Sequence, residues 1–114
     1  LELVYGDSAL SVPAYEATSM CQLIFIDGGH TYEAATADVQ NFRRLADHSL
    51  VGHTLVVDDI QSPEVLSAWE EAETAGVLVH DATLQDFSRF YNWRDAEVVV
   101  NIGRYQPGPT SQST

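Results

Sequence analysis

The order of apolar and polar positions along the chain predicts alternating strands and helices. Apolar runs of strand length lie at residues 1–5, 21–26, 53–57, 77–80 and 96–102. Apolar side chains recur at spacings of three or four, as in helices that bury one face, over residues 9–17, 31–45 and 62–75. The predicted order is therefore strand, helix, strand, helix, strand, helix, strand, strand.

Residues at the expected helix ends support these boundaries. Thr31 is expected to cap the helix over 31–45, where its hydroxyl can accept a free backbone N–H. Ser62 is expected to cap the next helix, with Pro63 at the first helical position, and Gly76 is expected to end it.

The alternation of strands and helices predicts an α/β fold with an open sheet. The strand at 21–26 is almost continuously apolar, which indicates burial on both faces. We therefore expect a mainly parallel sheet with an antiparallel C-terminal strand and helices on both faces. One domain is expected over residues 1–105. Residues 106–114, which hold Pro, Gly, Ser and Thr without an apolar pattern, are expected to be a disordered tail.

Acidic residues follow two of the predicted buried strands. Asp27 comes after the strand at 21–26, and Asp58 and Asp59 come after the strand at 53–57. Neighbouring strands lie about 4.8 Å apart, so carboxylates at adjacent ends can share one cation, and Mg²⁺ or Ca²⁺ suits such oxygen ligands. The alternative is that one carboxylate caps the next helix while another faces solvent.

A histidine follows the first of these acids. Gly28 and Gly29 let the backbone turn tightly, which brings His30 to the mouth of the same site. An imidazole there can accept a proton from a hydroxyl that a nearby cation has acidified. The alternative is a surface histidine that only orients the loop.

The charge of the chain limits its partners. Its 17 Asp and Glu residues outnumber its 5 basic residues, all Arg, and the net charge is −12. We therefore expect no nucleic-acid partner and no anionic membrane partner, because binding phosphates needs clustered Lys and Arg. The single cysteine, Cys21, has no partner for an internal disulfide, and no apolar run is long enough to cross a bilayer. These features favour a cytoplasmic protein with no membrane association.

Two segments together resemble a known family. The run LIFIDGGHTYE at residues 23–33, the amphipathic helix after it and TLVVDDI at residues 54–60 resemble the C-terminal half of a class I S-adenosylmethionine-dependent methyltransferase. The chain is most similar to the small-molecule O-methyltransferase-like branch, over roughly residues 1–102. This resemblance implies a partial Rossmann-like sheet. It also implies S-adenosylmethionine as cofactor, and it leaves open whether Mg²⁺ is bound as well.

The resemblance carries over to individual residues. The positions implied to bind Mg²⁺ are Asp27, Asp58 and Asp59. The catalytic position is that of His30, where metal-dependent relatives usually have a lysine base. The positions implied to approach the S-adenosylmethionine cofactor are Gly6, Asp7, Ser8 and Asp27.

Part of the family pattern has no counterpart in these 114 residues. The glycine-rich loop that holds the cofactor is absent, and so is the acid that binds its ribose. We therefore expect a fragment that binds S-adenosylmethionine poorly. In the family sheet two further strands lie between those corresponding to residues 1–5 and 21–26. The segment 1–5 is thus expected to move to another edge, to pair with a second copy in a homo-oligomer, or to be poorly ordered.

Three functions are consistent with these observations. The first is methyl transfer by the intact parent protein from S-adenosylmethionine to an oxygen of a small-molecule acceptor. The second is a non-catalytic half-domain that acts as an interaction module through its exposed sheet edge. The third is a metal-dependent hydrolase, which the lack of any lysine and of a phosphate-binding loop disfavours.

Overall fold

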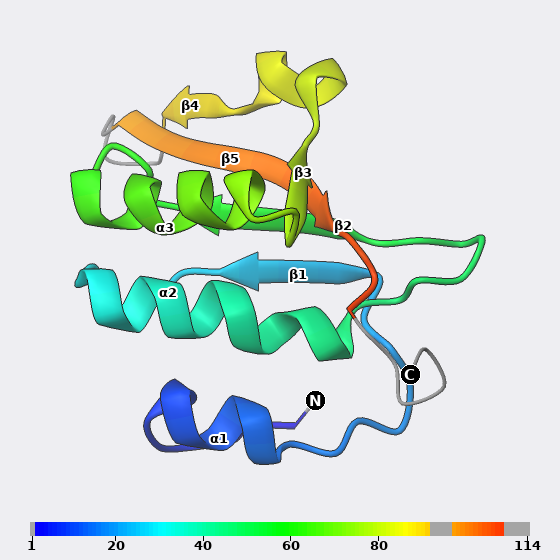
Figure 1. The fold of residues 1–114 in the computed structure, drawn as a ribbon. Coiled ribbons are helices and arrows are strands. Elements are labelled where there is room, and N and C mark those ends of the chain that lie inside the picture. The colour runs from blue at the N-terminus through cyan, green and yellow to red at the C-terminus, as the bar shows by residue number, and fades with distance from the viewer. Residues whose placement is uncertain (1, 92–96, 109–114) are drawn as a thin grey trace.

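The chain forms an open sheet with helices packed against it (Figure 1). The computed structural model describes residues 2–91 and 97–108. The helices and 3₁₀ turns are α1 (Ser8–Ala14), α2 (Tyr32–Asn41), η1 (Phe42–Leu45), α3 (Pro63–Thr74) and η2 (Ala82–Phe87). The strands are β1 (Leu23–Ile26), β2 (Thr54–Asp58), β3 (Leu78–His80), β4 (Arg89–Tyr91) and β5 (Glu97–Tyr105). None of these described helices has the length and apolarity needed to span a membrane, and the longest, α3, has 12 residues.

The sheet has the strand order β1-β2-β5-β3, with β4 paired to β5 outside this path. β1 and β2 are parallel neighbours, whereas β5 is antiparallel to β2, β3 and β4. The predicted α/β fold with an open sheet and an antiparallel last strand is confirmed. The sheet is mixed rather than mainly parallel as predicted, because among the described strand pairs only β1–β2 is parallel. Because β1, β2 and β3 run in the same direction, their carboxyl ends lie at the same edge of the sheet.

One face of the sheet carries the hydrophobic core. Buried side chains of β1 and β2 join those of α2 and α3 in one cluster, which includes Ile24, Leu55, Val39 and Trp69. Both helices belong to crossovers that advance across the sheet in the same direction, from β1 to β2 and then towards β3. Since such crossovers are right-handed, they place α2 and α3 on the same face.

The opposite face of the sheet is exposed at β1. Side chains alternate along this strand, so that Ile24 and Ile26 are buried while Leu23 and Phe25 are 66% and 54% exposed. The predicted burial of this strand on both faces is therefore wrong. The predicted helices on both faces are not found either, because α2 and α3, the longest described helices, pack on the same side.

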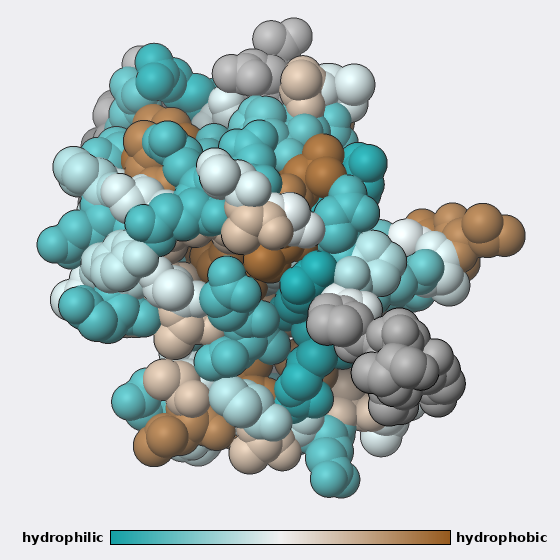
Figure 2. All heavy atoms as spheres, viewed as in Figure 1, coloured by the Kyte–Doolittle hydropathy of each residue, from teal (hydrophilic) through white to brown (hydrophobic). Residues whose placement is uncertain are grey.

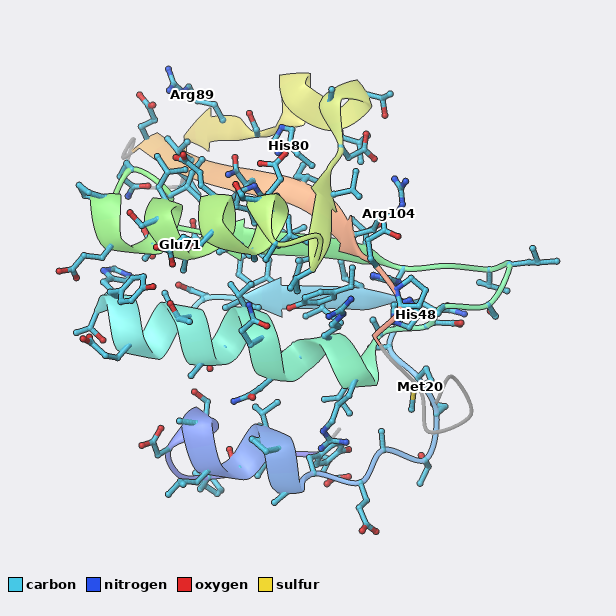
Figure 3. All side chains as sticks on the ribbon, viewed as in Figure 1. Met20, His48, Glu71, His80, Arg89 and Arg104 are labelled. Carbon is cyan, nitrogen blue, oxygen red and sulfur yellow. The ribbon has the colours of Figure 1, made fainter. Side chains whose placement is uncertain are left out.

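The two core helices are also joined by a polar contact. The Tyr32 hydroxyl at the start of α2 donates to the Glu71 carboxylate. Figure 3 shows Glu71 pointing from α3 towards α2. This hydrogen bond raises the pKa of the Tyr32 phenol, because ionisation would place a second negative charge beside Glu71.

The helix ends agree with the sequence in most respects. Thr31 caps α2 as predicted, since its hydroxyl accepts the Ala34 N–H at 3.1 Å. Pro63 is the first residue of α3, and Gly76 follows the helix with a φ of 77°. Ser62 precedes α3, but its side chain makes no capping hydrogen bond, so this detail of the prediction is wrong. Its carbonyl instead accepts the Leu66 N–H at 3.0 Å.

The N-terminal segment does not join the sheet. Residues 2–5 form no strand, and Leu3 and Tyr5 are 66% and 86% exposed. The predicted strand is therefore absent from the described part of this segment. The chain continues into α1, where the Asp7 carboxylate caps the helix by accepting the Ala9 N–H at 3.0 Å.

Arg44 attaches α1 to the rest of the molecule. Its Nη2 donates to the Val12 carbonyl at 2.6 Å and also to the Tyr15 carbonyl. Both carbonyls lie at the C-terminal end of α1, where helix carbonyls carry partial negative charge, and the Val12 carbonyl also accepts the Tyr15 N–H at 3.2 Å. A single guanidinium therefore satisfies the end of this short helix.

Replacing Arg44 with alanine is expected to lower the free energy of unfolding by about 1–3 kcal/mol, because two carbonyls lose a charged donor. Urea titration measures this loss, and limited proteolysis should show faster cleavage near α1. Arg89→Ala is the matched control, since it also removes one positive charge but breaks only an exposed ion pair with Glu97 at 2.9 Å. Equal stability of the two variants would contradict the role of Arg44.

Arg43 holds the other end of the described chain. Its Nε donates to the Gln106 carbonyl at 2.7 Å, and its Nη2 donates to the Pro107 carbonyl at 3.0 Å. β5 extends to Tyr105, beyond the predicted strand end at 102. The first residues of the predicted tail are thus bonded to the body of the protein, and residues 109–114 lie outside the described residues.

A histidine fixes the loop that leads into β2. His53 Nε2 accepts the Tyr105 N–H at 2.8 Å, so His53 Nδ1 carries the hydrogen that it shares with the Asp47 carbonyl at 2.8 Å. The part of the loop that precedes His53 projects from the molecule, with Leu50 107% and Val51 74% exposed. Figure 2 shows this apolar projection clearly. His53 therefore holds the base of the loop against the last strand.

Candidate functional site

The acidic strand ends predicted from the sequence lie side by side. β1 and β2 are paired with Ile26 opposite Val57, so Asp27 and Asp58 follow at the same level of the sheet. The expectation that these strands are parallel neighbours is therefore confirmed. Their carboxyl ends form one edge, which is where open α/β sheets usually bind ligands.

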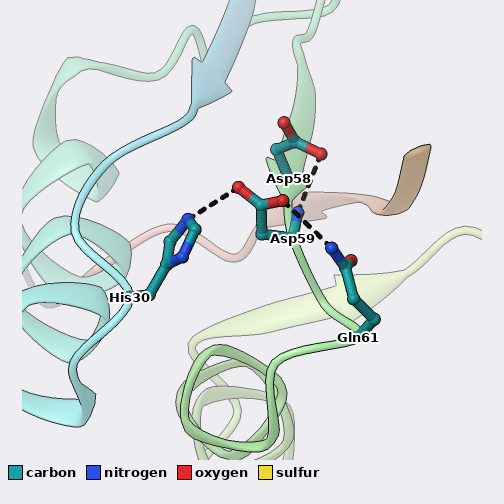
Figure 4. Close-up of polar contacts among 4 residues, drawn as sticks. All are labelled: His30, Asp58, Asp59 and Gln61. Atoms are coloured by element: carbon teal, nitrogen blue, oxygen red, sulfur yellow. Dashed lines mark hydrogen bonds and ion pairs between the residues drawn. The ribbon is translucent and has the colours of Figure 1, made fainter. Parts of the chain in front are cut away.

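His30 and Asp59 form the central contact at this edge. His30 Nε2 lies 2.7 Å from Asp59 Oδ2 (Figure 4). Asp27 lies beside them, and one potential ligand atom from each of the three residues falls within 4.8 Å of the others. The His30 side chain is 59% exposed and that of Asp59 is 25% exposed, so the cluster is open to solvent.

The turn after β2 directs the Asp59 carboxylate towards His30. Asp59 has a φ of 62°, and among the described residues it is the only non-glycine with positive φ. Short polar residues tolerate this conformation better than others. Asp58 Oδ1 accepts the Asp59 N–H at 2.8 Å, and Gln61 Nε2 donates to Asp59 Oδ1 at 3.1 Å. These bonds leave Asp59 Oδ2 facing the imidazole.

Asp58 is closer to the core than its neighbour. Burial raises the pKa of its carboxyl, and the negative charges of Asp59 and Asp27 raise it further. The site therefore carries more negative charge than His30 alone can balance. A bound cation would relieve this repulsion.

The raised pKa of Asp58 predicts a pH-dependent stability. Its protonated form favours folding at low pH, and this contribution is lost as the pH rises from the ordinary value of 3.8 through the folded pKa. In EDTA, Asp58→Asn is expected to melt above wild type at pH 7, with the difference shrinking as the pH falls towards 3.8. Melting temperatures across this range measure the effect.

Asp81→Asn provides a control of opposite sign. Hydrogen bonds from Thr83 lower the pKa of Asp81, so its charged form favours folding above pH 3.8. This variant should melt below wild type at pH 7. If Asp58→Asn also melts below wild type there, the predicted cost of its charge is wrong.

Three of the four residues expected to approach the cofactor lie away from the sheet, at the start of α1. Gly6 precedes the helix, Asp7 caps it and Ser8 is its first residue. The Ser8 hydroxyl donates to Asp38 Oδ1 at 2.6 Å. The side chains of Asp7 and Ser8 are thus engaged within the chain, whereas Asp27 joins the cluster with His30.

Two residues of this region were not expected from the sequence. Gln61 contacts Asp59, and Asp38 lies beneath the loop that carries His30. Aspartate side chains are mostly exposed in folded proteins, but that of Asp38 is buried. Its position three residues after buried Ala35 was the available signal, since residues at this spacing share a helix face.

The donor set fits a divalent cation. Asp27 and Asp59 offer carboxylate oxygens, which suit Mg²⁺, and His30 offers an imidazole nitrogen, which adds affinity for Mn²⁺ and related ions. Asp58, also expected as a ligand, instead accepts the backbone N–H of Asp59 through Oδ1.

The fold and the cluster define an α/β domain with a carboxylate–imidazole site at the carboxyl ends of two parallel strands. Comparison with protein-family models, with curated proteins and with solved structures finds no match.

Proposed function

We propose that this chain is the acceptor-binding portion of an S-adenosylmethionine-dependent methyltransferase domain that methylates an oxygen of a small molecule. The observation that carries the proposal is the His30–Asp59 contact at 2.7 Å, with Asp27 in reach, at the ends of two parallel strands. It supplies a proton acceptor and cation ligands at one place.

The sheet supports this proposal. The resemblance implies a partial Rossmann-like sheet, for which an antiparallel C-terminal strand is expected, and β5 is antiparallel to β2, β3 and β4. It also implies further strands beside β1. β1 is at the end of the described strand order, with β2 on one side of it, so its other edge is the place where such strands would pair.

His30 is the proposed proton acceptor for the methyl-accepting hydroxyl. Asp59 Oδ2 accepts the hydrogen on His30 Nε2 and so orients the imidazole, which leaves Nδ1 as the nitrogen that takes the proton; the carboxylate then stabilises the protonated ring. A cation held by Asp27 and Asp59 would lower the pKa of that hydroxyl. Removing the proton matters because the neutral hydroxyl is a weak nucleophile. No acid is needed for the other half of the reaction, because the sulfonium loses its methyl group to become a neutral thioether.

The residues described do not fit a complete S-adenosylmethionine site. The 114 residues contain no glycine-rich cofactor loop, and Asp7 and Ser8 make hydrogen bonds within the chain. We therefore assign no step of cofactor binding to this chain.

The proposal is tested in the complete gene product that contains this chain. Calorimetry should detect S-adenosylmethionine binding, and labelled methyl groups should appear on members of a panel of phenolic acceptors, with more transfer in Mg²⁺ than in EDTA. His30→Ala should reduce transfer by about 10²–10⁴-fold while cofactor binding persists. His48→Ala, a histidine outside the cluster, is the control. Absence of S-adenosylmethionine binding would refute the proposal.

An interaction module is the second candidate. β1 exposes the apolar side chains of Leu23 and Phe25, and it also lies at an edge of the described sheet. β1 has β2 as its pairing partner in the sheet. A hollow of about 380 Å³ lies nearby, lined in part by Cys21, Val12, Phe42 and Leu45. A Phe25→Glu variant that abolishes self-association in light scattering, in a protein without methyl transfer, would favour this second function.

A further inference from the structure

Asp38 is a buried carboxylate beneath the candidate site. Its side chain, on α2, is 3% exposed, and no other acidic or basic side chain that the structure describes is buried to this degree. Burial of a carboxylate is unfavourable unless hydrogen bonds compensate for lost water. The position of this group therefore needs a specific explanation.

One oxygen of Asp38 bonds α1, and the other lies against the loop after β1. Oδ1 accepts the Ser8 hydroxyl at 2.6 Å. Oδ2 lies so close to Gly28 that a Cβ at that residue would fall well inside 3.0 Å, a separation that real side chains essentially never show. Asp38 and Gly28 also line one small cavity together with His30 and Asp58.

Gly28 lies between the two residues that this loop brings to the site. Asp27 precedes it and His30 follows two residues later. A shift of the backbone at Gly28 would therefore move the side chains of Asp27 and His30 relative to Asp59, which follows a different strand. The His30–Asp59 distance of 2.7 Å leaves little room for such a shift.

We propose that Asp38 is a positioning residue: its carboxylate supports the backbone at Gly28, so that Asp27 and His30 face Asp59, and Ser8 fixes its orientation. Groups that orient ligands in this way often change metal affinity by about 10–100-fold when they are removed. The inference rests on the proposed function for the cation, but the geometric part concerns only the His30–Asp59 contact.

The test uses the 114-residue chain and two readouts. The imidazole nitrogen and ring-proton NMR signals of His30, at fixed pH in EDTA, report its contact with Asp59. Electron paramagnetic resonance of free Mn²⁺ reports cation affinity. Asp38→Ala should shift the His30 signals towards those of an Asp59→Ala reference and weaken Mn²⁺ binding about tenfold or more. Asp38→Asn keeps the shape and an oxygen for Ser8, and should retain the wild-type His30 signals.

A pair of substitutions that adds a methyl group at Gly28 and removes the carboxylate of Asp38 separates positioning from loss of stability. Gly28→Ala should disturb the His30 signals because its methyl group meets the carboxylate. Adding Asp38→Ala removes the obstruction, and the double variant should recover signals closer to wild type than either single variant. Leu78→Ala, a buried core truncation in β3, is the stability control and should leave the His30 signals unchanged.

The outcomes distinguish this inference from the proposed function. If wild type does not bind Mn²⁺, the cation site fails, while the His30 signals still test the positioning role. Unchanged His30 signals in folded Asp38→Ala would overturn the inference. Equal disturbance of these signals by Leu78→Ala would also overturn it, because the effect would then follow stability alone.

Discussion

Gly103→Ala is expected to unfold at a much lower urea concentration than wild type. A Cβ at this position in β5 would lie 2.9 Å from Trp69 Cη2 and even closer to the Val79 carbonyl. The carbonyl belongs to β3, which is paired with β5 at this point, so it cannot retreat without breaking the ladder. Trp69 is 1% exposed, so its ring is enclosed by the core. We expect a loss of about 3 kcal/mol or more, the upper range for overpacking.

The neighbouring position on β5 provides the control. Arg104 is exposed, and Figure 3 shows its side chain pointing away from the sheet. Arg104→Ala should therefore change the free energy of unfolding by less than about 0.5 kcal/mol. Trp69→Leu added to Gly103→Ala should recover only part of the loss, because the contact with the Val79 carbonyl remains. Equal urea midpoints for Gly103→Ala and wild type would contradict the close approach of β3 and β5.

Asp59→Asn is expected to weaken Mn²⁺ binding about 10–100-fold with little change in stability. Asparagine tolerates the positive φ of 62° and keeps an oxygen for the hydrogen bond from Gln61, but it removes the charge that is proposed to hold the cation. Titration of Mn²⁺ measures the affinity, and urea denaturation measures stability in the same samples.

Two further variants separate the carboxylate from the backbone. Asp59→Gly should lose cation binding as well, yet remain folded, because glycine adopts positive φ without strain. Asp59→Ala should lose binding and also about 1–2 kcal/mol of stability, since alanine is strained in this conformation. Wild-type Mn²⁺ affinity in the glycine variant would exclude Asp59 as a ligand.

The parallel pairing of β1 with β2 was predictable because it depends on short local sequence patterns. Each strand is a short apolar run followed directly by aspartate, and parallel strands bring such ends to one edge. The pairing of His30 with Asp59 rather than with Asp58 was not predictable. It depends on the positive φ of Asp59, which turns one carboxylate towards the loop and leaves the other near the core.

The exposed face of β1 could not be recognised from the sequence. Leu23, Ile24, Phe25 and Ile26 are all apolar, so the pattern gives no sign that alternate residues face solvent. What covers each face depends on where the helices cross, and both core helices cross on the same side.

The role of Asp38 was also hidden, because its partner Ser8 lies 30 residues away in the chain. Residue type alone suggested a solvated position. Only the folded arrangement shows that α1 supplies a hydroxyl to a carboxylate under the loop after β1.

The adjacent residues Arg43 and Arg44 have a joint consequence. One holds the carbonyls of Gln106 and Pro107, and the other holds those of Val12 and Tyr15. Both belong to η1, a short turn between α2 and the loop before β2. A fluctuation that opens this turn would release both of these segments together. Amide hydrogen exchange of α1 and of the end of β5 is therefore expected to proceed as one cooperative unit, although the two segments are far apart in sequence.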